Sequence, residues 1–285
     1  MKIICFDIGG TNISKAVVEI EGESYNFLDF TTEPNPKEAG EIEQTLVSYA
    51  DDSKTKFAVS EIAISAAGIV GQWRLAVSGL ESCYGKDSFR FTFLKRRGFK
   101  VKMENDGRCF AMGEFVFGKS KGKKSVLSLA VGTGIGGGFL LKGKSLKGAH
   151  HSALEVGHMK IQMSGNDWMD WEQFAAGKGI ALQYQLRAGN AKSTHDIFES
   201  RESDPISEEV IESGAEALGV GIANLINIFD PEFIVIGGGI SKHTFYIEKA
   251  FEIAQKHIFN REISPQWAIS ELKRKANILG AASLF

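Results

Sequence analysis

Phe6-Asp7-Ile8-Gly9-Gly10-Thr11 lies between two apolar runs, Ile3 to Phe6 and Ile13 to Ile20. Two strands joined through Gly-Gly-Thr form a hairpin, and glycines let the backbone N–H groups of the turn approach an anion without obstruction by side chains. The carboxylate of Asp7, just before the turn, is placed to orient a hydrated divalent cation beside that anion. The stretch predicts a phosphate-binding turn for a nucleotide. A plain hairpin turn is the alternative.

Similar units of a strand followed by glycines recur twice along the chain. Val131 to Gly138 again continues into a strand, whereas Ile236 to Ser241 follows a strand and precedes a helix. A duplicated lobe whose two hairpins face each other across a cleft would bring both turns onto one polyphosphate. The glycines of the third unit favour a flat slot for a base, and an ordinary strand-to-helix turn is the alternative.

Length, charge and cysteine content exclude several classes of protein. The 285 residues bury a sizeable core and are long for one lobe, so we expect two lobes. The formal charge of −2 provides no basic field for nucleic acid. The three cysteines fit a reducing cytoplasm and neither a disulfide framework nor a thiolate metal cluster. No apolar stretch reaches about 18 residues, and the chain enters a strand at once, so we expect neither a membrane span nor a signal peptide.

Strand and helix patterns mix along the chain in an order that indicates an α/β fold. Patterns typical of strands cover residues 2–8, 13–20, 25–31, 61–66, 99–104, 125–131, 135–142, 158–163 and 232–236. Helical patterns cover residues 37–50, 106–117, 168–186, 206–228 and 243–258. The helix at 206–228 has the clearest apolar face and stops before Asp230-Pro231, as proline requires.

Candidate catalytic groups follow the strand that starts at Phe99. Asn105 and Asp106 stand where this strand gives way to a helix, and strand ends that face a cleft carry the ligand sites of open α/β sheets. The Asn105 amide both donates and accepts hydrogen bonds, and the Asp106 carboxylate is suited to accept the proton of an attacking hydroxyl. A helix N-cap at Asp106 is the alternative interpretation.

Further polar side chains suited to a polyol occur downstream. Glu155-Val156-Gly157-His158 precedes a predicted strand, and Glu172 lies in a predicted helix. Carboxylate and imidazole groups together bind several hydroxyls at once. By itself His158 is typical of a structural histidine and Glu172 of a solvated helix residue, so their functional interpretation depends on the whole set. We expect His150 and His151 to be loop residues without a role.

Six motifs follow one another over essentially the whole chain. They are Asp7-x-Gly-Gly-Thr11, Glu104-Asn105-Asp106, Gly132-Thr-Gly-x-Gly-Gly-Gly138, Glu155-x-x-His158, Asp230-Pro231 with Gly237–Gly239, and Leu279-Gly-Ala-Ala282. Their succession resembles the ROK family of sugar kinases and sugar-responsive repressors. The resemblance implies an α/β fold of the two-lobed, actin-like (hexokinase-like) ATPase type with a central cleft. It implies a small lobe of residues 1–116 plus a C-terminal helix at about 272–285, and a large lobe of 117–271.

The resemblance also implies a role for each motif. The positions that would hold the ATP phosphates with Mg²⁺, Asp7 through a water ligand of the metal, are Asp7, Gly9, Gly10, Thr11, Gly132, Thr133 and Gly134. The turn near adenosine comprises Gly237, Gly238 and Gly239. The positions that match sugar contacts are Asn105, Asp106, Glu155, His158 and Glu172, and Asp106 matches the catalytic base. A homodimer is also implied.

Three departures from the family pattern bear on metal and sugar. Many members carry a zinc-binding cluster of three cysteines beside the glutamate that aligns with Glu172, completed by the histidine that aligns with His158. This chain has no cysteine in residues 166–171, so we expect no zinc site and keep His158 as a sugar ligand only. Leu154 precedes Glu155 where the family usually has glycine. The stretch Val77–Asp87 lacks the asparagine expected near the sugar.

The sequence therefore predicts a cytoplasmic, ATP-dependent hexose kinase. The sugar-matching side chains offer mostly acceptors and no cation, which fits neutral hydroxyls and not a carboxylate or a sugar phosphate. Glucose is the first candidate, and N-acetylmannosamine or another hexose is the alternative. A non-catalytic sugar or nucleotide sensor on the same fold stays open. A repressor of the family would need a helix-turn-helix before the first strand, so we expect no DNA binding.

Overall fold

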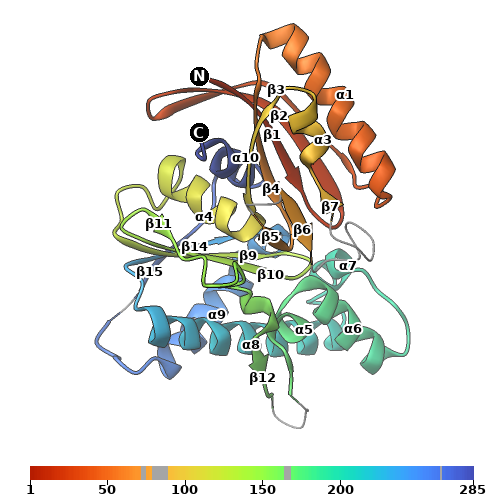
Figure 1. Ribbon diagram of the computed structural model, residues 1–285. Coiled ribbons are helices and arrows are strands. Elements are labelled where there is room, and N and C mark those ends of the chain that lie inside the picture. The colour runs from red at the N-terminus through yellow and green to blue at the C-terminus, as the bar shows by residue number, and fades with distance from the viewer. Residues whose placement is uncertain (72–74, 79–88, 164–167, 264) are drawn as a thin grey trace. The chain divides into compact units, whose positions relative to one another are not determined.

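The computed structural model describes residues 1–71, 75–78, 89–163, 168–263 and 265–285. The chain divides into two compact units (Figure 1). Unit 1 comprises Met1–Gly122, Gly138–Ala153 and Glu271–Phe285, and unit 2 comprises Lys123–Gly137 and Leu154–Ser270. Within the part of the chain that the structure describes, no helix has both the length and the apolar character needed to cross a bilayer.

Unit 1 is built on a five-stranded sheet with the order β3-β2-β1-β4-β8. Its elements are β1 (Lys2–Ile8), β2 (Asn12–Glu21), β3 (Ser24–Pro34), α1 (Ala39–Phe57), β4 (Glu61–Ala66), β5 (Ile69–Gly71), β6 (Ala76–Ser78), β7 (Phe89–Arg90), α3 (Thr92–Arg96), β8 (Lys100–Asn105), α4 (Asp106–Phe117), β11 (Lys144–Ser145) and α10 (Lys275–Ala282). The strands β1, β2 and β3 pair antiparallel, whereas β1, β4 and β8 run parallel. The last three therefore end at the same edge of the sheet.

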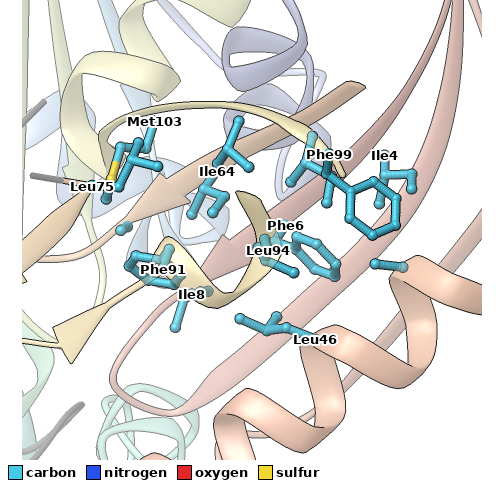
Figure 2. Close-up of a cluster of buried hydrophobic side chains, with 14 of the residues drawn as sticks. Ile4, Phe6, Ile8, Leu46, Ile64, Leu75, Phe91, Leu94, Phe99 and Met103 are labelled. Carbon is cyan, nitrogen blue, oxygen red and sulfur yellow. The ribbon is translucent and has the colours of Figure 1, made fainter. Parts of the chain in front are cut away.

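The sheet of unit 1 is buried on both faces, because successive side chains of a strand point to opposite sides. On one face Phe6 of β1 packs with Leu46 of α1 and Leu94 of α3 (Figure 2). On the other face Cys5 of β1 packs with Cys109 of α4 and Leu279 of α10. The near-continuous apolar run at the start of the chain thus forms a central strand covered by helices on both sides.

Unit 2 contains the parallel strands β9, β14 and β15, with β14 in the middle. Its elements are β9 (Ser125–Val131), the 3₁₀ turn η2 (Val156–His158), β12 (Lys160–Ile161), β13 (Met169–Asp170), α5 (Trp171–Ala175), α6 (Gly177–Ala188), α7 (Thr194–Glu199), α8 (Pro205–Phe229), β14 (Phe233–Gly237), the 3₁₀ turn η3 (Gly239–Lys242), α9 (Thr244–His257) and β15 (Gln266–Ile269). The strand β10 (Ile135–Leu141) begins in unit 2 and ends in unit 1. The order of this sheet is β11-β10-β9-β14-β15.

The predicted helix at 206–228 is confirmed as α8. The Asp204 side chain accepts a hydrogen bond from the Ile206 amide and Pro205 occupies the first turn, which together fix the start of the helix. Asp230 ends it in a left-handed conformation just before Pro231. Local sequence signals are therefore sufficient to set both ends of this helix.

Two element predictions around the sugar motif are wrong in extent. The single helix predicted at 168–186 is divided into β13, α5 and α6, because Ala176 is extended and the Gly177 amide donates to the Gly132 carbonyl. The strand predicted at 158–163 is reduced to β12, since the chain first forms the turn η2. In the first case a tertiary hydrogen bond interrupts the predicted helix, and in the second a turn shortens the predicted strand.

Candidate active site

Two carboxylates meet at the edge where β1, β4 and β8 end. Asp7 is the second-last residue of β1 and lies in register with Ser65 of β4, whose neighbour Ala66 pairs with Asn105 of β8. Asp106 follows directly as the first residue of α4. Ser65 Oγ donates to Asp7 Oδ1 at 2.6 Å. Parallel strand order thus brings residues from distant parts of the sequence to one place.

The Asp106 carboxylate is held in a defined orientation by its neighbours. The Gly107 amide donates to Oδ1 at 2.9 Å, and Asn105 Nδ2 donates to the same oxygen at 3.1 Å. The N-cap of α4 is Asn105, whose Oδ1 accepts from the Arg108 amide at 3.1 Å. The alternative in which Asp106 is the cap is therefore wrong. Within the described residues, the hydrogen bonds from Gly107 and Asn105 both reach Oδ1.

Asn105 uses its side chain within the protein. Its Nδ2 also donates to the Gly68 carbonyl at 3.1 Å, so both amide protons are engaged, and the residue is buried. An amide has two protons to donate. In this arrangement Asn105 orients Asp106. A hydrogen bond from Nδ2 to any ligand would require Asn105 to release either the Gly68 carbonyl or Asp106 Oδ1.

Burial raises the pKa values of both carboxylates. It raises the pKa of Asp7 to about 7, against the hydrogen bond from Ser65 and with the charge of Asp106 adding to the rise. Burial also raises the pKa of Asp106, against the hydrogen bond from Gly107. A carboxylate with a raised pKa is a stronger proton acceptor, which is what a general base requires.

The first glycine turn is closed by a residue that sequence reasoning missed. The Asn35 side chain donates to the Gly9 carbonyl at 2.7 Å, and the Asn35 amide donates to the Thr11 carbonyl at 2.9 Å. These bonds occupy turn carbonyls, while the Gly9 amide donates to Asn12. Among the described residues no acceptor contacts the amides of Gly10 and Thr11. The turn therefore presents N–H groups, as an anion site needs.

The second glycine turn, in unit 2, encloses the carboxylate of Glu172. Glu172 Oε2 accepts from the Ile135 amide at 3.0 Å. A Cβ at Gly134 would lie 2.4 Å from this oxygen, and one at Gly157 would lie 2.8 Å from it. Gly157 requires glycine because a Cβ there would also lie 2.4 Å from the Ile135 carbonyl, whereas a Cβ at Gly134 would require the Glu172 carboxylate to shift. Glu172 therefore contacts the predicted phosphate turn and the Glu155-x-x-His158 motif together.

Buried contacts fix α5 and with it Glu172. The Trp171 side chain is fully buried, and its Nε1 donates to the Ala217 carbonyl of α8 at 2.8 Å. Its ring occupies the space over Gly221, where a Cβ would lie 2.0 Å away. The Trp171 amide also donates to Met159 at 2.8 Å. A short helix of five residues is thus held rigidly by its neighbours.

The third glycine turn lies next to the second. Gly237 at the end of β14 pairs with Ala130 of β9, so both turns follow the same edge of the unit 2 sheet. A Cβ on Gly132 would lie 3.5 Å from the Gly239 amide. Gly238 has φ +88 and a Cβ there would lie 2.3 Å from the Val131 carbonyl, so this position requires glycine.

The remaining predicted sugar residues lie on the surface of unit 2. Glu155 is exposed, and the His158 side chain is 66% exposed with Nδ1 3.2 Å from Asp170 Oδ2. Lys160 also pairs with Asp170 and, with His158, lowers the pKa of that carboxyl. Leu154 adopts φ +69, the left-handed region in which glycine is favoured. The turn before Glu155 therefore keeps a glycine-like backbone without the glycine.

Parts of two expectations lie outside the described residues. Residues 79–88 include most of the stretch Val77–Asp87, and residues 164–167 include Asn166 and Asp167 of the segment without cysteines. Sequence reasoning missed Asn277 as well as Ser65 and Asn35. Asn277 Nδ2 donates to Asp7 Oδ1 and to the Asp106 carbonyl, each at 3.3 Å. The sequence feature that could have indicated Asn277 is that this polar residue lies two positions before the Leu279-Gly-Ala-Ala282 motif.

Comparison with known proteins identifies the family. The model of the ROK family matches residues 3–285. A glucokinase from Streptomyces coelicolor is 26% identical over 98% of this chain and 95% of its own length. An N-acetyl-D-glucosamine kinase from Haemophilus influenzae is 27% identical, with coverage of 98% and 97%.

A solved structure supports the same relationship in three dimensions. The ROK family glucokinase from Streptomyces griseus in complex with glucose and AMPPNP superimposes with a TM-score of 0.85 at 26% identity. The match covers 100% of this chain and 99% of that one. The fold class predicted from the sequence, the two-lobed actin-like α/β fold, is confirmed.

Proposed function

The chain belongs to the ROK family, and from that premise we propose that it is an ATP-dependent kinase of a neutral hexose. One observation carries the proposal: Asp7 and Asp106 meet at one edge of the unit 1 sheet, and the side-chain hydrogen bonds that they accept from Ser65, Asn277 and Asn105 reach Oδ1. Asp7, next to a phosphate-type turn, is suited to orient a metal ion. Asp106, at the start of a helix, is suited to accept a proton.

The proposed reaction is transfer of the γ-phosphoryl group of ATP to a sugar hydroxyl. Asp106 Oδ2 accepts the hydroxyl proton while the sugar oxygen bonds to the γ-phosphorus and the bond from that phosphorus to ADP breaks. The amides of Gly10 and Thr11 donate to phosphate oxygens, and Asn105 keeps Asp106 in its orientation. Binding energy is used to align the reactants and to exclude water, which would compete as the nucleophile.

The carboxylate oxygens of Asp7 fit a hydrated magnesium ion, because Mg²⁺ prefers oxygen ligands and keeps several of its waters. Asp7 would hold the ion through water beside the Gly10-Thr11 turn. The ion would neutralise charge that develops on the phosphoryl oxygens. When the ion is near, its charge favours the ionised form of Asp7 and offsets the effect of burial on the carboxyl pKa.

Glucose is the proposed substrate, supported by the glucokinase relatives. Asn105, Asp106, Glu155, His158 and Glu172 are the proposed sugar-site residues, and none carries a cation that would select an acidic sugar. N-acetylmannosamine or another hexose is the second candidate, because a relative of similar identity is named an N-acetyl-D-glucosamine kinase. We propose further that the protein is a cytoplasmic homodimer, and that it has no zinc site because residues 166–171 lack cysteine.

A coupled assay with a panel of hexoses and N-acetylhexosamines tests the activity and the substrate. The variant Asp106→Asn is expected to lose turnover on the order of 10²-fold or more, while calorimetry still detects sugar binding. Asp196→Asn, at an exposed carboxylate in the first turn of α7, is the control and should retain turnover. ATP binding without sugar phosphorylation by the wild type would favour a sensor. Normal turnover in Asp106→Asn would remove the assignment of the base.

A further inference from the structure

One side-chain amide joins the carboxylate of Asp7 to the main chain of Asp106 in the unit 1 site. Asn277 lies on α10 between the buried residues Ala276 and Ile278. Its Nδ2 is 3.3 Å from Asp7 Oδ1 and 3.3 Å from the carbonyl oxygen of Asp106. Both protons of this amide are therefore used, one for each residue. No other described side chain donates to both of them.

The position of Asn277 depends on an unusually close approach of two helices. A Cβ at Gly280 of α10 would lie 1.7 Å from the Cys109 carbonyl of α4, and one at Gly113 of α4 would lie 2.0 Å from the Ala276 carbonyl of α10. The two backbones are thus in direct contact, and α10 lies beside α4 (Figure 1). This contact brings a residue near the C-terminus to the start of α4.

The amide restricts both groups that the proposed chemistry uses. Ser65 and Asn277 donate to the same oxygen of Asp7, Oδ1, which fixes the rotation of the carboxylate and directs Oδ2 to its free side. The bond to the Asp106 carbonyl fixes the peptide that carries the proposed base. Phosphoryl transfer depends on such alignment, because an error of about 1 Å costs on the order of 10²-fold in rate.

We propose that Asn277 is a positioning residue that ties the Asp7 carboxylate to the main chain of Asp106 and so keeps the two residues in a fixed relative position during phosphoryl transfer. This inference rests on the proposed kinase function. It goes beyond that function because it assigns a role to a residue of the C-terminal helix that is not among the proposed nucleotide- and sugar-binding residues.

Asn277→Leu removes the amide and keeps a similar volume. The variant is expected to lose turnover about 10- to 100-fold with little change in the sugar KM. The acidic limb of its kcat/KM profile should move to higher pH, because a carboxylate that loses a donor becomes easier to protonate. The charged groups facing Asp7 are Asp106 and Arg274, and the Cys109 thiol is also near. All are unchanged in the variant.

A matched control lies at the other end of the same helix, at the C-cap of α10. The Ser283 hydroxyl donates to the Gly280 carbonyl at 2.7 Å and has no contact with either carboxylate. Ser283→Ala should retain the wild-type turnover and pH profile. Asn277→Gln keeps the donor on a longer arm and should recover part of the turnover. Wild-type turnover and pH profile in a folded Asn277→Leu variant would overturn the inference, even if this variant melts at a lower temperature.

A measurement without substrates separates this inference from the proposed function. A crystal structure of Asn277→Leu without substrates should show a rotated Asp7 carboxylate or a displaced Asp106 peptide. Unchanged positions of both groups overturn the inference whether or not the wild type is a kinase. Lack of sugar phosphorylation by the wild type, together with a displaced group in Asn277→Leu, would reject the kinase proposal and support the role of Asn277 in positioning Asp7 and Asp106.

Discussion

Leu154 carries a backbone conformation that ordinarily belongs to glycine. Its φ is +69, and His151, three residues earlier, has φ +58. For residues with a Cβ the left-handed region costs about 1–2 kcal/mol. The His151 carbonyl accepts from the buried Arg108 guanidinium at 3.3 Å, and Arg108 pairs with Glu104 at 2.9 Å. The loop before the Glu155 motif is therefore held in a strained form by contacts at one end.

Replacement of Leu154 tests this strain. Leu154→Gly and Leu154→Ala both remove the side chain, but only glycine removes the steric penalty at positive φ. Leu154→Gly should therefore be more stable than Leu154→Ala by about 1 kcal/mol, measured as the free energy of unfolding in urea. Equal stabilities would show that Leu154 relaxes to an ordinary conformation in solution. Because strain of this kind often accompanies ligand sites, the sugar KM of Leu154→Gly should be measured beside its stability.

At the scale of elements, the sites are made by strand ends and helix starts that lie together in each sheet. In unit 1 the ends of β1 and β8 bring Asp7 to Asp106. In unit 2 the ends of β9 and β14 bring the Gly132 turn beside Gly239. The carboxyl ends of neighbouring parallel strands are where open α/β sheets bind ligands. Each sheet therefore offers a phosphate-type turn with supporting groups from the neighbouring strand.

Gly239 provides a test of the third turn that leaves the fold intact. A Cβ at Gly239 would meet no atom within 4 Å in the structure, so Gly239→Ala should fold normally. If the nucleotide approaches this turn closely, the added methyl group should raise the ATP KM and leave the sugar KM unchanged. Gly40→Ala, at a second position with no atom within 4 Å, is the matched control. An unchanged ATP KM in Gly239→Ala would place the nucleotide elsewhere.

At the scale of the whole molecule, the ionisation of Asp7 is coupled to folding. Its pKa is about 7 in the folded protein, above the value of about 3.9 for an unfolded chain. The folded state thus binds the Asp7 proton more tightly than the unfolded state does. The contribution of this proton to the free energy of unfolding is complete below pH about 4. This effect is lost as the pH rises to about 7, after which it stays constant.

The variant Asp7→Asn isolates this contribution because asparagine does not titrate. The stability of the wild type relative to Asp7→Asn should fall, by on the order of 1–3 kcal/mol, as the pH rises from about 4 to about 7. Urea-induced unfolding of both proteins across this range provides the measurement. A difference that rises with pH would mean that a nearby positive charge, such as Arg274, dominates the Asp7 site.

The sequence by itself determined the elements and the motifs that carry chemistry. The strand β1, the helix α8 with its Asp204 and Asp230 ends, and the glycine turns follow from local patterns, since apolar periodicity, capping and proline act over a few residues. The order of motifs was sufficient for the family and the fold class, which the comparisons confirm.

Only the tertiary structure decided which residues support these motifs. Asn277 reaches Asp7 across 270 residues of sequence because α10 packs against α4 through glycines. Glu172 enters the second glycine turn because the Trp171 side chain is fixed on α8, and the hydrogen bond from the Gly177 amide to the Gly132 carbonyl divides the helix that the local pattern predicts. Such contacts depend on which backbones touch in the folded chain, and a close approach between distant segments leaves no periodic signal in either one.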